Sequence, residues 1–194
     1  MPGEYNATIA LTLKLGFYNT GRDLVLTRIR RIALTFAGLI AIAAHPLPAS
    51  AAGQTIYADR LVNGWQPWGW ATINYAAHAP VHSGHASIAV TVKKGWDALY
   101  IHHNAFDTKA YSAFTFWVNG GPKGGQVLQI QATANKKPVK YYKLPALRAN
   151  AWTKITVPLA SLGAAHRKDI DGFWIEDGTG KPLATFFVDD IALK

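Results

Sequence analysis

The chain has 194 residues, enough for one domain and short for two, and its 20 Lys and Arg against 11 Asp and Glu give a net charge of +9. Cysteine is absent, which excludes disulfides, a thiolate nucleophile and a cysteine-ligated zinc site. Aromatic residues make up 12% of the chain and charged residues only 16%, which excludes a disordered charged tail and a coiled coil and indicates a globular domain.

Residues 1–52 have the layout of an N-terminal extension followed by a secretory signal peptide. Three arginines between positions 28 and 31 precede the uncharged apolar run 32–44, and small residues follow at 49–52. The run of about 13 residues is shorter than the ~18–20 that span a bilayer. We expect cleavage before Ala52 or Gly53, an uncleaved membrane anchor being the alternative. The mature domain is then 53–194.

Within 53–194, apolar and polar residues alternate with a period of two, which is typical of strands, and helical periodicity is hard to find. Glycine-, proline- and asparagine-rich turns, such as 119–125, separate the alternating runs. About eight to ten short strands with these spacers predict an all-β sandwich or barrel. The expected strands are Ser87–Val92, Trp96–His103, Phe114–Asn119, Val127–Ala132, Val139–Leu144, Trp152–Leu159, Gly172–Glu176 and Thr185–Leu193, with one helical turn at Leu159–Leu162.

Several of these segments resemble the jelly-roll carbohydrate-binding modules of secreted bacterial proteins, which belong to the galactose-binding-like β-sandwich group. The matching segments are the entry Ile56–Leu61, the middle stretch Val81–Val90, the penultimate region Trp152–Leu159 and the closing strand Phe186–Leu193. The resemblance covers nearly all of 55–193. It implies an antiparallel β-sandwich (jelly roll) that binds sugar in an extracellular or periplasmic setting, and it does not identify the sugar, since the fold hosts many ligands.

Aromatic side chains are the main binding chemistry of this sequence. A pyranose is bound by an aromatic ring laid against its apolar C–H face, with amides and carboxylates reaching its hydroxyls. The segment 63–70 holds Trp65, Gln66, Trp68 and Trp70, and an extended segment puts Trp68 and Trp70 on one side. We expect at least one of these tryptophans on a ligand surface, and the alternative is that all three are buried in the core of the sandwich.

Two later strands supply further candidates. Leu99 and Ile101 are the natural core residues of 96–103, so alternation turns Trp96, Tyr100 and His102 to the other face. By the same alternation Trp174 shares a face with Glu176, which offers an indole platform beside a hydroxyl acceptor, unless both belong to a second buried layer. The predicted ligand-binding residues are Trp65, Gln66, Trp68, Trp70, Trp96, Tyr100, His102, Trp174 and Glu176.

The resemblance also implies a structural calcium ion where the first and last strands meet, and the matching residues are Asp59 and Asp190. Asp189 and Asp190 point to opposite faces of a regular strand, and Asp189 should share its face with Ile191, so Asp190 is the expected ligand. Calcium takes six to eight oxygens, so backbone carbonyls and water would complete the set. Alternatively, Asp59 pairs with a neighbouring cation, Arg60 or Lys194, and Asp190 caps a turn.

The histidines give a weaker metal signal. His82 and His85 could share an ion only if a turn brought them together, and His102 and His103 point to opposite faces of a strand. We expect hydrogen-bonding histidines, with His102 or His103 at the ligand site.

Catalysis finds little support in the sequence. The nucleophile elbow, the phosphate loop and the H-E-x-x-H motif are all missing. Glycoside hydrolysis needs two carboxylates, and Glu176 with one of Asp97, Asp107 or Asp177 shows no diagnostic spacing. The lysine-rich hairpin around 136–143 would suit an anionic polysaccharide or a cell envelope, or would only guard a strand edge.

The predicted function is therefore a secreted or periplasmic, non-catalytic module that binds a polysaccharide or oligosaccharide. We expect a monomer with no nucleic-acid partner and no membrane span after cleavage. One alternative is a small secreted polysaccharide-active enzyme that uses Glu176 and an aspartate partner, and the other is a structural protein of the envelope or matrix.

Overall fold

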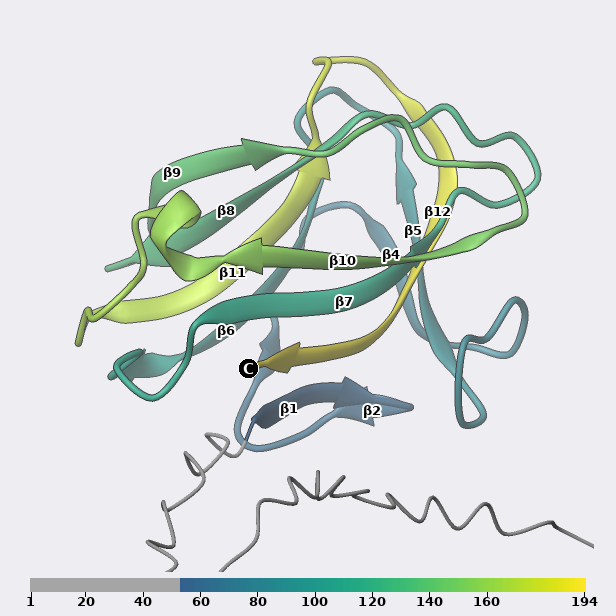
Figure 1. The fold of residues 1–194 in the computed structure, drawn as a ribbon. Coiled ribbons are helices and arrows are strands. Elements are labelled where there is room, and N and C mark those ends of the chain that lie inside the picture. The colour runs from purple at the N-terminus through teal and green to yellow at the C-terminus, as the bar shows by residue number, and fades with distance from the viewer. Residues whose placement is uncertain (1–52) are drawn as a thin grey trace, which may run out of the picture. The chain divides into compact units, whose positions relative to one another are not determined.

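Residues 53–194, which a computed structural model describes, form two antiparallel β-sheets that pack face to face (Figure 1). The expected leader and cleavage site in 1–52 lie outside the described residues. The elements are β1 (Gln54–Ala58), β2 (Arg60–Leu61), β3 (Gln66–Pro67), β4 (Thr72–Ala77), β5 (Ser87–Val92), β6 (Ala98–Phe106), β7 (Ala113–Asn119), β8 (Leu128–Ala134), β9 (Lys137–Lys143), β10 (Trp152–Pro158), the 3-10 turn η1 (Leu159–Leu162), β11 (Ile170–Asp177) and β12 (Leu183–Leu193).

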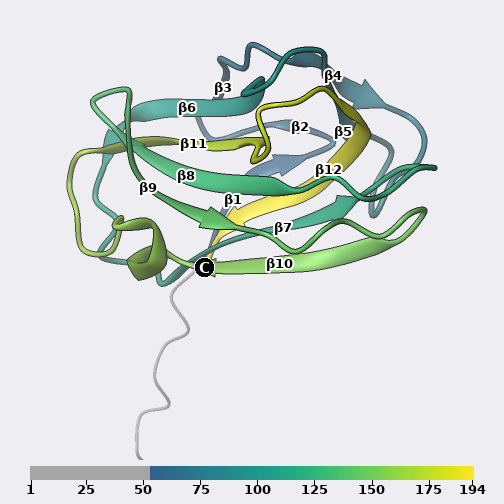
Figure 2. The same ribbon diagram turned by 90° about the horizontal axis from the view of Figure 1, so that it is seen from above.

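The first sheet has five strands in the order β3-β6-β11-β8-β9, and the second has seven. In the second, the path β10-β7-β12-β1-β2 is joined by β5, which pairs with β12, and by β4, which pairs with β5. Figure 2 shows β6, β11, β8 and β9 as one layer, with β7 and β10 in the layer beneath it. The predicted antiparallel β-sandwich is confirmed. Among the described residues there is also no helix long and apolar enough to cross a membrane.

The core lies between the sheets and follows the alternation in the sequence. Phe114 and Phe116 of β7 point inward from one sheet, and Phe173 of β11 points inward from the other. The rings of Phe114 and Phe173 stack across the interface, with centroids 4.2 Å apart and planes at 11°. Each such fully buried side chain contributes about 1.5–3 kcal/mol relative to an exposed one, so these alternating residues hold the sheets together.

Most predicted strands appear with small changes in their bounds. Ser87–Val92 and the helical turn Leu159–Leu162 are observed as predicted. The strand expected from Trp96 begins instead at Ala98, because Trp96 lies in a turn with a φ of 69°. The expected entry segment is divided by a turn at Asp59, and the strand Thr72–Ala77 was not predicted at all.

A β-bulge in β12 changes the face on which its last residues lie. Val188 and Ile191 are both buried in the core although they are three residues apart, and Asp190 between them has a φ of 49°. The register between β12 and β7 shifts between Asp189 and Ala192. The expectation that Asp189 and Ile191 share a face is therefore wrong, because the extra residue reverses the alternation.

The hairpin between β8 and β9 turns through Asn135 and Lys136, whose φ values are 52° and 63°. Two residues with positive φ form the turn type that matches the twist of paired strands. The backbone N–H of Lys136 donates to the Asp171 carboxylate of β11 at 2.7 Å. The turn is thereby fixed against the neighbouring strand, and the Lys136 side chain is held at one end of the five-stranded sheet.

Gly172 in β11 is a point of close approach between strands. A Cβ there would lie 2.5 Å from Cε2 of Tyr100 and 2.7 Å from the carbonyl oxygen of Ile101. We expect Gly172→Ala to lower the free energy of unfolding by roughly 1–3 kcal/mol, since the backbone must shift to admit the methyl group. Urea unfolding of the variant measures this loss.

The matched control is Gly178→Ala, where the nearest atoms to the new Cβ are 3.3 Å or more away. This change should alter the free energy of unfolding by less than about 0.5 kcal/mol. Equal losses in Gly172→Ala and Gly178→Ala would contradict the proposed steric cause.

Candidate functional site

The outer face of the five-stranded sheet carries a group of aromatic side chains. We call this group, Trp68, Trp70, Tyr100, His102 and Trp174, the aromatic face. Trp70 stands edge-on to Trp174 with ring centroids 5.1 Å apart, and Tyr100 is edge-on to Trp174 at 5.7 Å. Trp68 lies edge-on to Tyr100 at 6.0 Å, so the five rings form one connected surface.

The two exposed tryptophans are placed by backbone pairing with β6. The N–H of Trp68 donates to the carbonyl of Tyr100 at 3.0 Å, and that of Trp70 donates to Ala98 at 3.1 Å. The segment therefore runs extended along the strand edge, and residues two apart project to the same side. Gly69 between them is required for this approach, because a Cβ there would lie 2.9 Å from the Ala98 carbonyl oxygen.

The aromatic face has an exposed layer above a buried one. Trp68 and Trp70 are 40% and 46% exposed, whereas Tyr100 and His102 are buried. Trp68 stacks on the His102 ring with centroids 3.6 Å apart and planes at 7°. The buried rings thus support the exposed ones and leave indole surface open to a ligand.

Hydrogen bonds orient both exposed indoles. The Trp70 N–H donates to the backbone carbonyl of Trp96 at 2.9 Å, and the Trp68 N–H donates to Oε1 of Gln66 at 3.1 Å. Each indole is therefore anchored at its nitrogen, which lowers the entropy that a ligand must remove on binding.

Polar side chains lie beside the aromatic rings on the same face. Glu176 of β11 is buried and accepts hydrogen bonds from the amides of Gln129, at 2.6 Å, and Gln131. Gln131 is also the cross-strand neighbour of Trp174. A row of amides beside an indole is the arrangement that recognises sugar hydroxyls next to a pyranose ring.

Burial shifts the ionisation of the groups in this face. It raises the pKa of Glu176, an effect that the hydrogen bonds from Gln129 and Gln131 only partly offset. Burial likewise lowers the pKa of His102 and raises the pKa of Tyr100. All three shifts favour the neutral forms of Glu176, His102 and Tyr100.

A second polar group lies at the Lys136 end of the face. The Thr133 hydroxyl donates to the buried carboxylate of Asp171 at 2.6 Å and lies 3.3 Å from the Tyr100 hydroxyl. The ammonium of Lys136 lies over the Trp68 ring, 5.3 Å from its centroid. This end therefore offers a donor directly above the indole.

Two buried nitrogens of the aromatic face have no hydrogen-bond partner within 53–194. They are Nδ1 of His102 and the indole Nε1 of Trp174. A buried polar atom without a partner costs free energy, so a ligand hydroxyl that reached either nitrogen would gain by satisfying it.

The structure brings together most of the predicted ligand-binding residues, places one in the core and changes the position of another. Trp65 is only 5% exposed and packs against Phe106 and Phe173 in the core, so its predicted place on the ligand surface is wrong. Trp96 is 54% exposed but precedes β6, so it does not share a strand face with Tyr100 and His102. Its backbone carbonyl instead holds Trp70.

Sequence reasoning missed the contribution of the β8–β9 hairpin to this face. The missed residues are Gln129, Gln131 and Thr133, and Lys136 is expected from the sequence only as part of a lysine-rich hairpin for an anionic polysaccharide or a guarded strand edge. A signal existed, because the first three alternate with the core residues Leu128, Ile130 and Ala132. What was not evident was that this strand lies beside Trp174 and Glu176.

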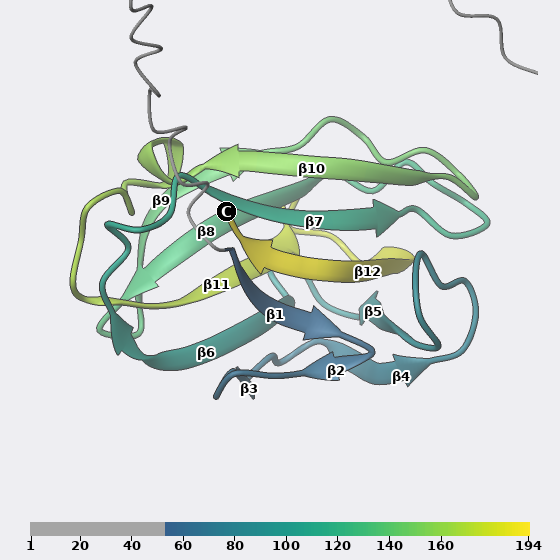
Figure 3. The same ribbon diagram turned by 60° about the horizontal axis from the view of Figure 1, so that its bottom comes forward.

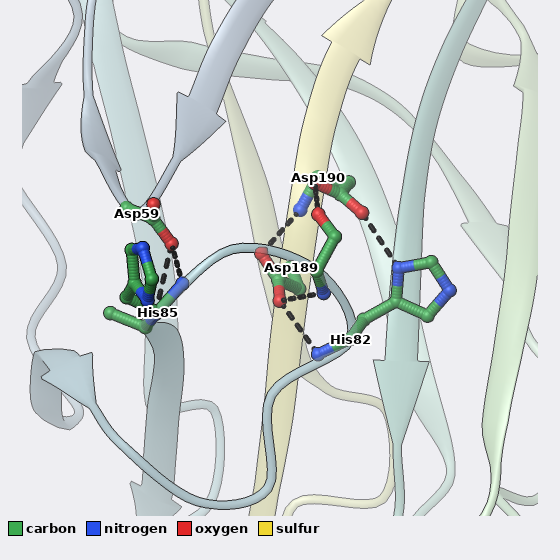
Figure 4. A network of polar contacts seen from close by, with 7 residues as sticks. Asp59, His82, His85, Asp189 and Asp190 are labelled. Atoms are coloured by element: carbon green, nitrogen blue, oxygen red, sulfur yellow. Dashed lines mark hydrogen bonds and ion pairs between the residues drawn. The ribbon is translucent and has the colours of Figure 1, made fainter.

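The predicted calcium ligands are bound by one loop, residues 80–86, as Figure 4 shows. Asp59 accepts the backbone N–H groups of His85 and Ala86 at 2.6 and 2.9 Å. Asp190 contacts Nδ1 of His82 at 2.7 Å and accepts the Ser83 hydroxyl at 2.6 Å. These contacts give each carboxylate a partner from the protein itself.

Asp189, the buried neighbour of Asp190, serves the same loop by accepting the N–H groups of His82 and Ser83. Within 53–194, no three His, Cys, Asp or Glu side chains are grouped so that they could hold one metal ion. A calcium ion at Asp59 and Asp190 would therefore depend on backbone carbonyls and water for most of its ligands, and it stays a prediction.

Thermal unfolding tests the calcium prediction directly. An ion that binds only the folded state raises the midpoint of unfolding as its free concentration rises. We expect a higher midpoint in millimolar calcium than in excess EDTA. Equal midpoints, with no calcium found by elemental analysis, would exclude the ion.

The acids proposed as partners of Glu176 have structural roles. Asp177 is fully buried and accepts backbone N–H groups from Trp96, Thr179 and Lys181. Asp97 accepts the N–H groups of two lysines in the turn before β6, and Asp107 accepts one N–H in its own turn. These contacts tie the three aspartates to backbone N–H groups, and none of them pairs an aspartate with Glu176 as the two carboxylates of a glycoside hydrolase would be paired.

The chain shares the fold of several solved carbohydrate-binding modules, a jelly-roll β-sandwich, which is the fold that its sequence resemblance implied. Two solved structures that share it are a mutant family 29 carbohydrate-binding module and the family 11 module of Clostridium thermocellum in complex with a β-1,3-1,4-mixed-linked tetrasaccharide. Each has a TM-score of 0.52 and 11% identity and covers 73% of this chain, with 91% and 94% of the respective module covered. Another family 29 mutant, complexed with mannohexaose, has a TM-score of 0.51.

Among curated proteins, an endoglucanase of Dictyostelium discoideum is 29% identical to this chain over 144 residues. The match covers 71% of this chain and 20% of the endoglucanase, so the chain spans about a fifth of that relative's length. No family profile matches the sequence.

Glu176 generates a prediction on pH. Its folded-state pKa is raised above the ordinary value of 4.5, so its contribution to stability is full below about pH 4.5 and is lost as pH rises through the folded-state pKa. Glu176→Gln keeps an oxygen for the two glutamines and has no charge to bury. We expect the variant to gain stability relative to the wild type between pH 4 and pH 7, measured by urea unfolding.

The control for this measurement is Thr72→Ala, an exposed and non-ionisable residue of β4, which should shift stability equally at both pH values. The prediction is wrong if Glu176→Gln loses more stability at pH 7 than at pH 4, because the charged carboxylate would then be the favoured form.

Proposed function

We propose that residues 53–194 are a non-catalytic polysaccharide-binding module that takes an extended sugar chain along the aromatic face. The observation that carries this proposal is the pair of exposed indoles, Trp68 and Trp70, projecting from one edge segment over a buried aromatic layer. Residues two apart in an extended segment are separated by about 6–7 Å, which is comparable with the length of one pyranose unit. Two successive sugars can thus each meet one indole.

The polar residues of the face suit a neutral chain. Gln129 and Gln131 are held by Glu176 and lie along the strand beside the rings, where their amides can meet hydroxyls. Glu176 itself is held toward its protonated form by burial, so the face lacks a free carboxylate at this point. Stacking would supply most of the affinity, and the amides would select the hydroxyl pattern.

The comparisons support the same reading. The solved modules that share the fold include structures bound to a mixed-linked tetrasaccharide and to mannohexaose, and the curated relative is an endoglucanase. From these we propose that the ligand is a β-linked polysaccharide of neutral sugars. We also propose that the protein acts outside the cytoplasm, secreted or periplasmic and as a monomer, after removal of its leader.

Substitution of the exposed indoles tests the proposal. Trp68→Ala and Trp70→Ala should each weaken binding to mixed-linked β-glucan or mannohexaose by roughly 1–3 kcal/mol, about five- to 150-fold in Kd. Isothermal titration calorimetry measures the affinity. Thermal unfolding should show that both variants keep the fold, because neither ring is buried.

The contrasting variant is Trp65→Ala, which removes a core ring and should cost about 3–5 kcal/mol of stability. If Trp68→Ala and Trp70→Ala instead unfold the protein or bind every glycan as the wild type does, the aromatic face is not the binding site.

Retention and turnover are separated in one further assay. The protein is incubated with insoluble cellulose, chitin and xylan, and reducing-sugar release is measured in the same tube. Retention without product agrees with a binding module. If the wild type releases reducing sugar and Glu176→Gln does not, the protein is an enzyme that uses Glu176 with an aspartate partner, and the proposal is wrong.

A further inference from the structure

The outer surface of the seven-stranded sheet, on the side away from the aromatic face, has a hollow of about 290 Å³. It lies over β7, β12 and β1, which Figure 3 shows side by side. We call it the outer hollow. Its lining includes the small side chains Thr55, Ala58, Thr115 and Ala192, which we call the floor, and the larger Trp117, Lys154, Asp190 and Lys194, which we call the rim.

The hollow results from irregular pairing and from small residues. The register between β12 and β7 shifts between Asp189 and Ala192, and that between β1 and β12 shifts between Thr55 and Tyr57. Both shifts occur beside the floor. The Thr115 hydroxyl donates to the Ala192 carbonyl at 3.2 Å, so the floor is already satisfied internally and its shape is fixed.

The rim has one well-anchored aromatic ring. Trp117 stacks on His82 with ring centroids 3.8 Å apart and planes at 19°, and Trp152 stands edge-on to His82 at 5.6 Å. His82 in turn contacts the Asp190 carboxylate (Figure 4). The Trp117 indole is therefore supported from behind and borders the hollow as a rigid wall, the kind of surface against which a pyranose ring packs.

The charge of the rim favours an anion. Lys154 is the cross-strand neighbour of Trp117, and Lys194 also lines the hollow; both are exposed. Within 53–194, the ion pairs are His82 with Asp190 and Arg167 with Asp169, so neither lysine is neutralised. The Asp190 carboxylate is already shared between His82 and Ser83, which leaves two free ammonium groups at the rim.

We propose that the outer hollow is a second saccharide site, selective for a pyranose that carries an anionic group, a carboxylate or a sulfate. The sugar ring would pack against Trp117 and its anionic group would lie between Lys154 and Lys194. The volume is at the small end of the range for ligand pockets, about 300–1,000 Å³, and suits one or two sugar units rather than a long chain. This site is independent of the proposed function of the aromatic face.

Calorimetry with small defined sugars tests the site on the purified protein. The probes are a galacturonic acid disaccharide, the neutral galactose disaccharide and its sulfated derivative. We expect the wild type to bind one or both acidic disaccharides in a salt-dependent manner and to bind the neutral one at least about ten-fold more weakly. The two acidic probes distinguish a carboxylate from a sulfate as the anionic group.

Variants then locate the binding. Lys154→Gln and Lys194→Gln remove one charge-assisted contact each and should weaken acidic-sugar binding about ten-fold or more. Trp117→Leu keeps a hydrophobic side chain at this half-buried position and should also weaken it. Lys168→Gln removes an exposed lysine of the loop before β11, which does not line the hollow, and should leave acidic-sugar binding unchanged.

Trp68→Ala separates this proposal from the previous one, since it should reduce binding to neutral polysaccharide and leave the acidic disaccharides unaffected. The second site is excluded by any of three results. These are no binding of either acidic sugar at millimolar concentration, an equal loss in Lys168→Gln, or loss of acidic-sugar binding in Trp68→Ala.

Discussion

The packing of the two sheets, centred on the stacked rings of Phe114 and Phe173, decides which side of each strand a ligand can reach. Because side chains alternate along a strand, turning Leu99, Ile101 and Phe173 into the core turns Tyr100, His102 and Trp174 outward. The aromatic face is therefore the other side of the same alternation that builds the core. A change that shifted the register of β6 or β11 would exchange core and site together.

The outward residues of the five-stranded sheet are also more buried than surface residues usually are. Trp68 and Trp70 cover Tyr100 and His102, and the glutamines of β8 cover Glu176. This second layer has two physical effects. It holds the exposed indoles in fixed orientations, which reduces the entropy lost on binding, and it removes the carboxylate from water, which favours its neutral form.

In the seven-stranded sheet, a bulge in β12 organises the structure around it. The bulge at Asp189 and Asp190 interrupts β12, and both carboxylates hold the loop 80–86 through its N–H groups and the His82 ring. The same loop thereby supports Trp117, while the loss of regular pairing opens the hollow beside it. One irregularity in a strand thus organises a loop, an aromatic wall and a concave surface that a regular sheet would lack.

The sequence by itself determined the fold class, the alternating core, the shared side of Trp68 and Trp70, and the outward side of Tyr100, His102, Trp174 and Glu176, because period-two alternation is a local property. Only the tertiary structure decided that Trp65 is a core ring and that Trp96 lies in a turn. It alone placed Gln129, Gln131 and Lys136 beside Trp174 and Trp68. These features depend on pairing between strands far apart in the chain and on a bulge that reverses alternation. No short stretch of sequence predicts that pairing or that bulge.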